Sequence, residues 1–523
     1  MLYLSIIYHM HQPYYKDLLT EETDFPWVRL HGIKDYLDMV EILENYPKIK
    51  LTFNLVPSLV EQINDYVEGN IKDRYFILSY KPAQELTQEE KRFILDNFFH
   101  INLERVISIF PRYYELYLKK QNKIEFSIQD FLDLQVWFNL AWFDPGYREK
   151  DLLLNELIKK ARFFTEEEKQ YVLDKEKEIL EKILPTYKHF KESAHIEIIT
   201  SAYYHPILPL LYSTKTAKEA NPKTELPKKV FSFPQDILGQ IRQAKALYNR
   251  YFTGFPSGLW PSEEAVSEHI VSFLIQEGFR WIVTDEAILF KSLRKKKRTA
   301  ELIYQPYILK RKEGDLVVVF RDRNLSDLIS FVYQNLKPQE AVDDFIKHLK
   351  NIHSAYKEIN PLVCVALDGE NAWEYYKNDG RDFLNLLYRS LQELDFIKTI
   401  TVSEYLNLYP TKSEIKRLAC GSWIFGVLNK WIGSPFKNRA WECLLEAREK
   451  LEEVKFGLTK EKLELALKQI YILEGSDWFW WYGENHTTFD ILFRKHLVNF
   501  YNIIGLPAPE ALKKPLVAVL SEP

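Results

Sequence analysis

Cysteine is scarce in this chain. Three cysteines occur among 523 residues, Cys364, Cys420 and Cys443, and they lie far apart without the spacing of a metal site. So long a chain is not a small disulfide-stapled scaffold, because it can bury a large core of its own. An odd cysteine count in a chain of this length is typical of a reducing compartment, so we expect a cytoplasmic protein.

The chain also lacks a charge excess and a targeting segment. Its 70 Lys and Arg against 74 Asp and Glu give a formal charge of -4, too balanced for electrostatics to favour a nucleic-acid or membrane partner. The apolar N-terminus, MLYLSIIYHMHQPYY, has no basic stretch before it, no small-residue cleavage site and too few apolar residues to span a bilayer. We expect it to form the first β-strand.

Aromatic residues, in contrast, are abundant. The 32 Tyr, 33 Phe and 12 Trp make up 15% of the chain. Sugar rings stack on such side chains through their flat C–H faces, but aromatic residues are first of all core material. Composition therefore gives only modest support to carbohydrate binding.

Short apolar runs alternate with helical stretches along the chain, which predicts strands joined by helical crossovers in a parallel sheet or barrel. Residues 80–192 are charged and helical without strand signals and indicate a helical insertion. After about residue 402 no strand run recurs, so we expect a catalytic barrel domain at 1–402 and a helical domain at 403–523. The predicted strands are 2–8, 50–56, 195–201, 280–285, 315–320 and 361–367.

Two glutamates stand side by side in PSGLWPSEEAVS, residues 256–267. The apolar spacing that follows predicts a helix beginning near Ser262. In one interpretation Ser262 caps this helix while Glu263 and Glu264 complement its N-terminal dipole. In the other, the same dipole keeps one carboxylate ionised, which suits a nucleophile.

A second acidic segment, PLVCVALDGENAWE, places Asp368 at the end of an apolar strand, followed by Glu370 and Asn371, with Trp373 close by. Asp-Gly alone is commonly a turn. Catalytic groups, however, collect at the C-terminal ends of barrel strands. Two carboxylates from two strand ends are what cleavage of a glycosidic bond requires, one to attack and one to protonate the leaving oxygen.

Histidines and charged residues follow other strands. His9 and His11 are two apart, so both point the same way. A metal site is one interpretation, but no Cys or third His stands at ligand spacing, and hydrogen bonding to substrate hydroxyls is the better use. His205 at another strand end is either a core residue or part of the site. Arg321 and Asp322 form either an internal ion pair or a substrate contact.

Tryptophans are dense near the C-terminus. EGSDWFWWYGEN holds Asp477 and five consecutive aromatics, Trp478 to Tyr482, and GSWIFGVLNKWIG adds Trp423 and Trp431. On a helix such a run faces every direction, so some rings are core and others are candidates for exposure. We expect at least one of Trp423, Trp431 and Trp478 to border the catalytic cleft.

Taken in order, five motifs resemble glycoside hydrolase family 57, especially its α-amylase and amylopullulanase members. They are HQP at 11–13, YYHPILPLL at 203–211, GLWPSE at 258–263, LDGENAWE at 367–374 and the Trp-rich segment at 421–442. The resemblance implies an α/β fold, an incomplete (β/α)7 barrel with a C-terminal helical region closing over the cleft. It also implies retaining chemistry on α-glucans without a cofactor or metal.

In that family the glutamate of the WPSE motif is the nucleophile and the aspartate that opens DGEN is the acid/base, which corresponds here to Glu263 and Asp368. The chain departs from the family at the residue after the nucleophile, where members usually have Gly and this chain has Glu264. It also has Thr200, Ser201 and Ala202 where members usually have Thr-Thr-Pro.

We therefore expect a retaining hydrolase of α-glucan polysaccharides or oligosaccharides, with its two carboxyl groups about 5 to 6 Å apart. A 4-α-glucanotransferase or branching enzyme would use the same pair. Two further interpretations are a non-catalytic glycan-binding protein and a metal-dependent hydrolase. The expected substrate-binding residues are His9, His11, His205, Trp260, Asp285, Arg321, Glu370, Asn371, Trp373, Trp423, Trp431, Asp477 and Trp478.

Overall fold

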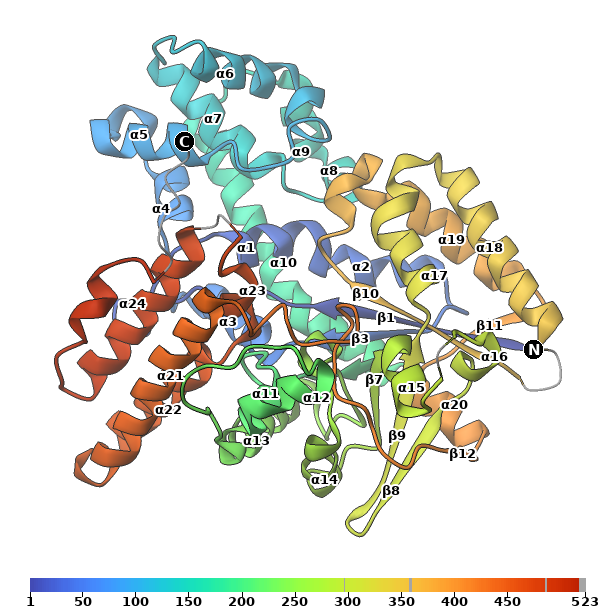
Figure 1. Ribbon diagram of the computed structural model, residues 1–523. Coiled ribbons are helices and arrows are strands. Elements are labelled where there is room, and N and C mark those ends of the chain that lie inside the picture. Colours follow the sequence, from blue (N-terminus) through green and yellow to red (C-terminus); the bar gives the residue numbers. More distant parts are fainter. Residues whose placement is uncertain (296, 357–359, 485–486, 517–523) are drawn as a thin grey trace.

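A nearly closed barrel of seven parallel strands forms the centre of the computed structural model, which describes residues 1–295, 297–356, 360–484 and 487–516 (Figure 1). Neighbouring strands pair in parallel around the ring. Two joints are weak: Cys364 alone pairs with Arg321 between β10 and β9, and Thr200 bridges to Leu259 of β6. The barrel strands are β1 Leu2–Met10, β3 Leu51–Leu55, β5 Ile196–Ile199, β6 Gly258–Leu259, β7 Trp281–Asp285, β9 Gly314–Arg321 and β10 Leu362–Asp368.

The predicted fold class is thus confirmed, and each of the six predicted strands corresponds to a barrel strand. The seventh strand, β6, has two residues, too few to produce a periodic pattern. The remaining strands lie outside the ring. β8 (Tyr307–Arg311) pairs antiparallel with β9, and β11 (Ile397–Thr399) pairs with the start of β1. The expectation of no strand after residue 402 is wrong for the two-residue β12 (Ser413–Glu414).

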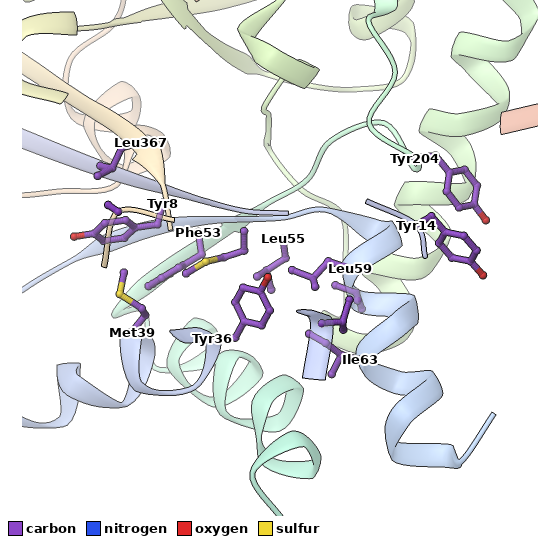
Figure 2. Packing of buried hydrophobic residues seen from close by; sticks show 14 of the residues in the cluster. Tyr8, Tyr14, Tyr36, Met39, Phe53, Leu55, Leu59, Ile63, Tyr204 and Leu367 are labelled. Carbon is purple, nitrogen blue, oxygen red and sulfur yellow. The ribbon is translucent and has the colours of Figure 1, made fainter. Parts of the chain in front are cut away.

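Alternate residues of β1 face opposite sides of the barrel wall, as the pleat of a strand requires. Tyr3 and Ile7 belong to the buried cluster inside the barrel, together with Trp281 and Cys364. The intervening residues pack outward under the helices. Figure 2 shows this outer layer, where Tyr8 and Phe53 pack near Met39. By the same alternation His9 faces the interior, at the C-terminal end of the barrel.

Helices surround these strands and cover the outer face of the wall, so every residue of β1 is buried. Around the barrel lie α1 Trp27–His31, α2 Asp38–Glu41, α3 Pro57–Glu68, α11 Leu208–Tyr212, α12 Ala217–Ala220, α13 Pro234–Phe252, α14 Glu268–Gln276, α15 Glu286–Ser292, α16 Ala300–Ile303, α17 Arg323–Asp327, α18 Pro338–Ala355, α19 Arg381–Glu393 and α20 Val402–Leu408.

A helical segment separates β3 from β5, over the range where the sequence lacks strand signals. Three of its helices start with capping boxes, Thr87 with Glu90, Ser127 with Asp130 and Thr165 with Glu168, which satisfy their first free amides. In Figure 1 α5 to α9 lie away from the strands. The segment comprises α4 Arg74–Tyr80, α5 Gln88–Asn97, α6 Pro111–Gln121, α7 Ile128–Leu140, α8 Pro145–Lys150, α9 Leu152–Lys160 and α10 Glu166–Glu192.

Four C-terminal helices complete the chain: α21 Pro435–Val454, α22 Lys460–Leu473, α23 Ser476–Trp481 and α24 Thr487–Ile503. They attach to the barrel through buried polar contacts as well as through apolar packing. Arg448 of α21 donates to the Asp236 carboxylate at 2.8 and 3.1 Å, and Gly475 bridges to Pro206 in the segment after β5. The start of α23 is thereby held against the C-terminal end of the barrel. No helix within the described ranges is long and apolar enough to cross a membrane.

We predict that Arg29→Ala destabilises the fold, because Arg29 joins α1 to the helical segment inside the protein. Its guanidinium donates to Asp73 at 2.9 Å, to Asn139 at 3.0 Å and to Glu176 at 2.5 Å, and Arg29 is 1% exposed. Removing one partner from a buried ion pair costs about 3–5 kcal/mol. The apparent free energy of unfolding in urea measures the loss.

The matched control is Arg74→Ala, since Arg74 pairs with Glu89 at the surface. Its effect is expected to stay below about 1 kcal/mol. Equal losses for the two variants would contradict a structural role for the Arg29 network.

Candidate active site

The corner after β6 holds Glu263 in a strained backbone. Ser262–Glu264 forms a single 3-10 turn in which Glu263 and Glu264 have φ angles of 59° and 50°. Left-handed backbone at two consecutive residues cannot continue as an α-helix. The predicted helix start at Ser262 is therefore wrong, and α14 begins at Glu268 after its N-cap, Ser267.

The Glu263 carboxylate is enclosed by donors from distant parts of the chain. Ser476 Oγ donates to Oε1 at 3.0 Å, and Trp423 Nε1 donates to Oε2 at 3.1 Å. His205 Nδ1 lies 3.9 Å from Oε1. With 8% of the residue exposed, Glu263 keeps only a narrow opening to solvent. Both hydrogen-bond donors to the carboxylate thus come from the C-terminal region, while His205 of the barrel lies beside it.

The pKa of Glu263 is raised to about 8, mainly by burial and also by the negative charges of Asp477 and Asp368, although the hydrogen bonds from Ser476 and Trp423 lower it. The expectation that a helix dipole keeps this carboxylate ionised is therefore wrong, because no helix begins there. Burial also raises the pKa of Asp368, against hydrogen bonding from Asn371. Each of the two carboxyls therefore keeps its proton to a higher pH than a solvent-exposed acid would.

Three histidines stack on one another beside Glu263. The His9 ring lies 4.7 Å from Trp260 at 9° and 4.9 Å from His205, and His11 lies 4.1 Å from His205. Asn54 bonds His9 Nδ1 at 2.6 Å. Burial lowers the pKa of His9 and of His205 well below the usual value, so both rings are neutral. His9 and His11 do point the same way, as their spacing predicts.

Ser476 and Asp477 open α23 and connect this stack to the C-terminal region. Ser476 Oγ lies 3.0 Å from His205 Nδ1 and also bonds Glu263, while Asp477 Oδ1 lies 2.9 Å from His11 Nε2. Sequence reasoning selected Asp477 but missed Ser476. Its only signal was its position beside Asp477, since serine alone before an aromatic run carries no chemistry.

Asp368 is the last residue of β10 and lies at the level of His9, its partner in the β1–β10 register, and the loop after it carries Glu370. Glu370 faces away from this position: its carboxylate accepts from the His11 amide at 3.1 Å, from Gln12 at 3.4 Å and from Tyr36 at 3.4 Å. At 1% exposure, Glu370 holds the loop rather than a ligand.

Asn371, in contrast, is exposed. Trp373 is buried, donates to the Gly369 carbonyl at 2.7 Å and packs on Tyr8 and Tyr376. Its ring is therefore a support for the loop.

Arg321 and Asp285 belong to a buried charge cluster under the site. Arg321 Nε lies 3.4 Å from Asp285 and its Nη2 donates to Asp327 at 2.6 Å, while Arg323 donates to Asp285 at 3.2 Å. Asp322 pairs with Arg298 instead, so the expected Arg321–Asp322 ion pair does not form. Asp285 is fully buried and paired with both guanidinium groups.

Glu264 points away from Glu263 into the barrel and is fully buried, with both carboxyl oxygens lacking a hydrogen-bond partner in the described protein. The interpretation of Glu264 as an acid at a helix start is wrong, because α14 begins at Glu268. Burial raises the pKa of Glu264 well above 4.5, although Arg321 opposes the shift, so burial favours the protonated side chain. Its φ of 50° lies in the left-handed region that Gly adopts more readily than Glu.

The tryptophans divide between core and site. The Trp431 ring packs near Trp480, and the Trp478 ring near Phe489 and His496; both are at most 1% exposed and unavailable for stacking on a sugar. Trp260 is equally buried, as the partner of His9. Trp423 keeps partial exposure, donates to Glu263 and covers the Arg321 guanidinium at 5.3 Å, so it is the one of the three that borders the carboxylates.

Metal-ligand groups are not assembled in the described residues. No set of three or more His, Cys, Asp and Glu side chains there is arranged to hold an ion. The three cysteines are all free and buried.

Comparisons with known proteins agree with this architecture. Alpha-amylase 1 of Dictyoglomus thermophilum is 25% identical to this chain over 167 residues. The matched residues cover 31% of this chain and 20% of that relative. A GH57-type branching enzyme from Pyrococcus horikoshii covers 100% of this chain and 98% of its own, with 18% identity and a TM-score of 0.60.

The alpha-amylase AmyC from Thermotoga maritima superposes with a TM-score of 0.58 and 14% identity, over 96% of this chain and 92% of its own. At these identities the two structures show a common fold. A sequence profile described as Glycosyl hydrolase family 57 matches residues 5–417, most of the chain. The chain therefore belongs to glycosyl hydrolase family 57.

Proposed function

We propose that this enzyme cleaves α-glucans with retention of configuration, with Glu263 as nucleophile and Asp368 as acid/base. The observation that carries the proposal is the setting of Glu263: an enclosed carboxylate on a strained corner, oriented by Ser476 and Trp423 and within the field of Asp368. A strained backbone persists where the surrounding contacts hold it in place, and such residues cluster at active sites. Relatives named α-amylase and branching enzyme support α-glucan as the substrate.

In the first step Glu263 attacks the anomeric carbon while Asp368 gives its proton to the departing glycosidic oxygen. The new ester bond replaces the glycosidic bond. In the second step Asp368 takes a proton from the incoming hydroxyl, whose oxygen displaces Glu263. A raised pKa on Asp368 favours the protonated acid that the first step needs, and the hydrogen bonds to Glu263 favour its ionised form.

The histidine stack would orient the sugar that is attacked. His11 is held by Asp477 and His205 by Ser476, and each keeps one ring nitrogen without a partner in the described protein, Nδ1 of His11 and Nε2 of His205. The neutral imidazole of His205 can donate to or accept from a sugar hydroxyl without adding charge. Asn371 and Trp423 are the other candidates, because both retain exposure beside the carboxylates.

The incoming hydroxyl decides between hydrolysis and transfer. Water gives hydrolysis, and a second glucan gives the chemistry of a 4-α-glucanotransferase or branching enzyme. A product profile of the wild type on maltoheptaose, amylose and pullulan distinguishes them: shorter products alone indicate hydrolysis, longer ones indicate transfer, and maltotriose from pullulan indicates α-1,6 cleavage. No turnover of any glucan would favour a glycan-binding protein, and loss of activity in EDTA would favour a metal-dependent hydrolase.

Exchange of the proposed nucleophile should abolish turnover. We expect Glu263→Gln to lower kcat by several orders of magnitude, because an amide cannot attack the anomeric carbon. Azide should partly rescue Glu263→Ala and give a glycosyl azide of inverted configuration, as read by NMR.

The matched control is Glu264→Gln, one residue on. Because burial favours the neutral form of Glu264, which an amide resembles, this variant should keep most of the activity and the pH profile of the wild type. An inactive Glu264→Gln beside a normally active Glu263→Gln would overturn the assignment.

The pH profile should report the hydrogen bond from Trp423. This bond stabilises ionised Glu263, so Trp423→Phe removes an effect that lowers the pKa and moves it above about 8. The acidic limb of kcat/KM should shift to higher pH, and the loss of activity should be greater at pH 6 than at pH 9.

Trp480→Phe is the control, since this ring packs near Trp431 and Lys430 rather than near Glu263. An unmoved limb in Trp423→Phe, or a shift to lower pH, would show that the bond does not set the ionisation of Glu263.

A further inference from the structure

A pocket of about 240 Å³ lies beside Asp368. Asp368, Asn371 and Gln334 give it polar atoms, and Phe331 and Tyr375 give it aromatic faces. Pockets for drug-sized ligands measure roughly 300–1,000 Å³, so this one suits a single small ring. It lies outside the histidine stack, since none of the three histidines lines it.

Phe331 and Tyr375 are exposed in a way that sets them apart from the other aromatic residues of the site. Phe331 is 67% exposed and Tyr375 53%, whereas Trp260, Trp373, Trp431 and Trp478 are at most 1% exposed. They come from two different segments, the π-helix Leu328–Val332 after α17 and the 3-10 helix Trp373–Tyr375 after β10. Large apolar faces left in water beside polar groups commonly mark a ligand contact.

The role proposed for Asp368 indicates on which side of the scissile bond this pocket lies. An acid that protonates the glycosidic oxygen must lie next to the leaving sugar, because the proton goes to the atom that the leaving sugar keeps. Glu263 attacks from the opposite face. A pocket that shares Asp368 and excludes Glu263 therefore lies on the leaving-group side.

We propose that this pocket binds the sugar ring on the leaving-group side of the bond, with Phe331 and Tyr375 stacking on its faces and Asn371 and Gln334 bonding its hydroxyls. The inference rests on the proposed role of Asp368. The same pocket receives the acceptor in the second step, so its aromatic pair sets how often a glucan rather than water resolves the glycosyl enzyme.

Two substrates separate this pocket from the rest of the site. Maltoheptaose has a sugar leaving group that must occupy the pocket, while α-maltosyl fluoride releases fluoride and places no sugar there. For Phe331→Ala and Tyr375→Ala we expect kcat/KM on maltoheptaose to fall about tenfold, because each variant loses the binding free energy of one stacked ring. The loss on maltosyl fluoride should be at least fivefold smaller.

Transfer gives a second readout. With maltosyl fluoride as donor and added maltose as acceptor, the ratio of transfer to hydrolysis should fall in both alanine variants and stay near the wild-type value in Tyr375→Phe, which keeps the ring. Phe456→Ala is the matched control, because Phe456 is 91% exposed on the C-terminal region and lines none of these surfaces. It should change neither ratio.

Equal losses on the two substrates, or no loss on either, would overturn the inference while leaving the proposed function intact. Loss of both activities through unfolding is recognised by thermal unfolding of each variant and is tested again with Tyr375→Phe. If the wild type turns over neither substrate, the proposed function fails and the inference that rests on it fails too.

Discussion

The site depends on the enclosure of the Glu263 carboxylate between the barrel and the C-terminal region. Ser476 is the contact through which this happens, since its hydroxyl lies between His205 after β5 and Glu263 after β6. Asp477, the next residue, holds His11 after β1. Three barrel strands and one C-terminal helix are thereby fixed in one arrangement. Without the C-terminal region Glu263 would lose both of its hydrogen-bond donors.

Burying the Glu263 carboxylate disfavours its ionised form, and the same holds for the other buried carboxyl groups near it. Burial raises the pKa of Glu263, Glu264, Asp368 and Glu370, so several carboxyls compete for protons at one end of the barrel. The paired guanidinium groups below, Arg321 and Arg323, compensate part of this charge. The charge state of the site is therefore a property of the cluster, and each substitution within it should be judged by its effect on the neighbours.

Sequence reasoning could predict the parts of the molecule that repeat. Alternation along β1 places His9 on the inside of the barrel, and its spacing from His11 gives them a common direction. The apolar run before Asp368 marks a buried strand. The segment around Glu263 has the sequence pattern of a helix start. Its left-handed backbone could not be predicted, because Glu rather than Gly stands at 264.

Contacts between distant segments were the least predictable. Trp423, Trp431 and Trp478 look alike in the sequence, yet only Trp423 reaches Glu263, because tertiary packing decides which ring is exposed. Tertiary packing also decides that Asp285 and Trp373 are buried, which the sequence does not indicate. Ser476 has no motif of its own, and its role depends on a helix that begins more than two hundred residues after Glu263.

The covalent intermediate is the central claim, and trapping it is the most direct test. A 5-fluoro-α-maltosyl fluoride should form a glycosyl enzyme that hydrolyses slowly, because the fluorine destabilises the oxocarbenium-like transition state of both steps. Mass spectrometry of the digested protein should then find the sugar on Glu263. A label on Glu264, Asp368 or Asp477, or turnover with inverted configuration and no label at all, would contradict the account.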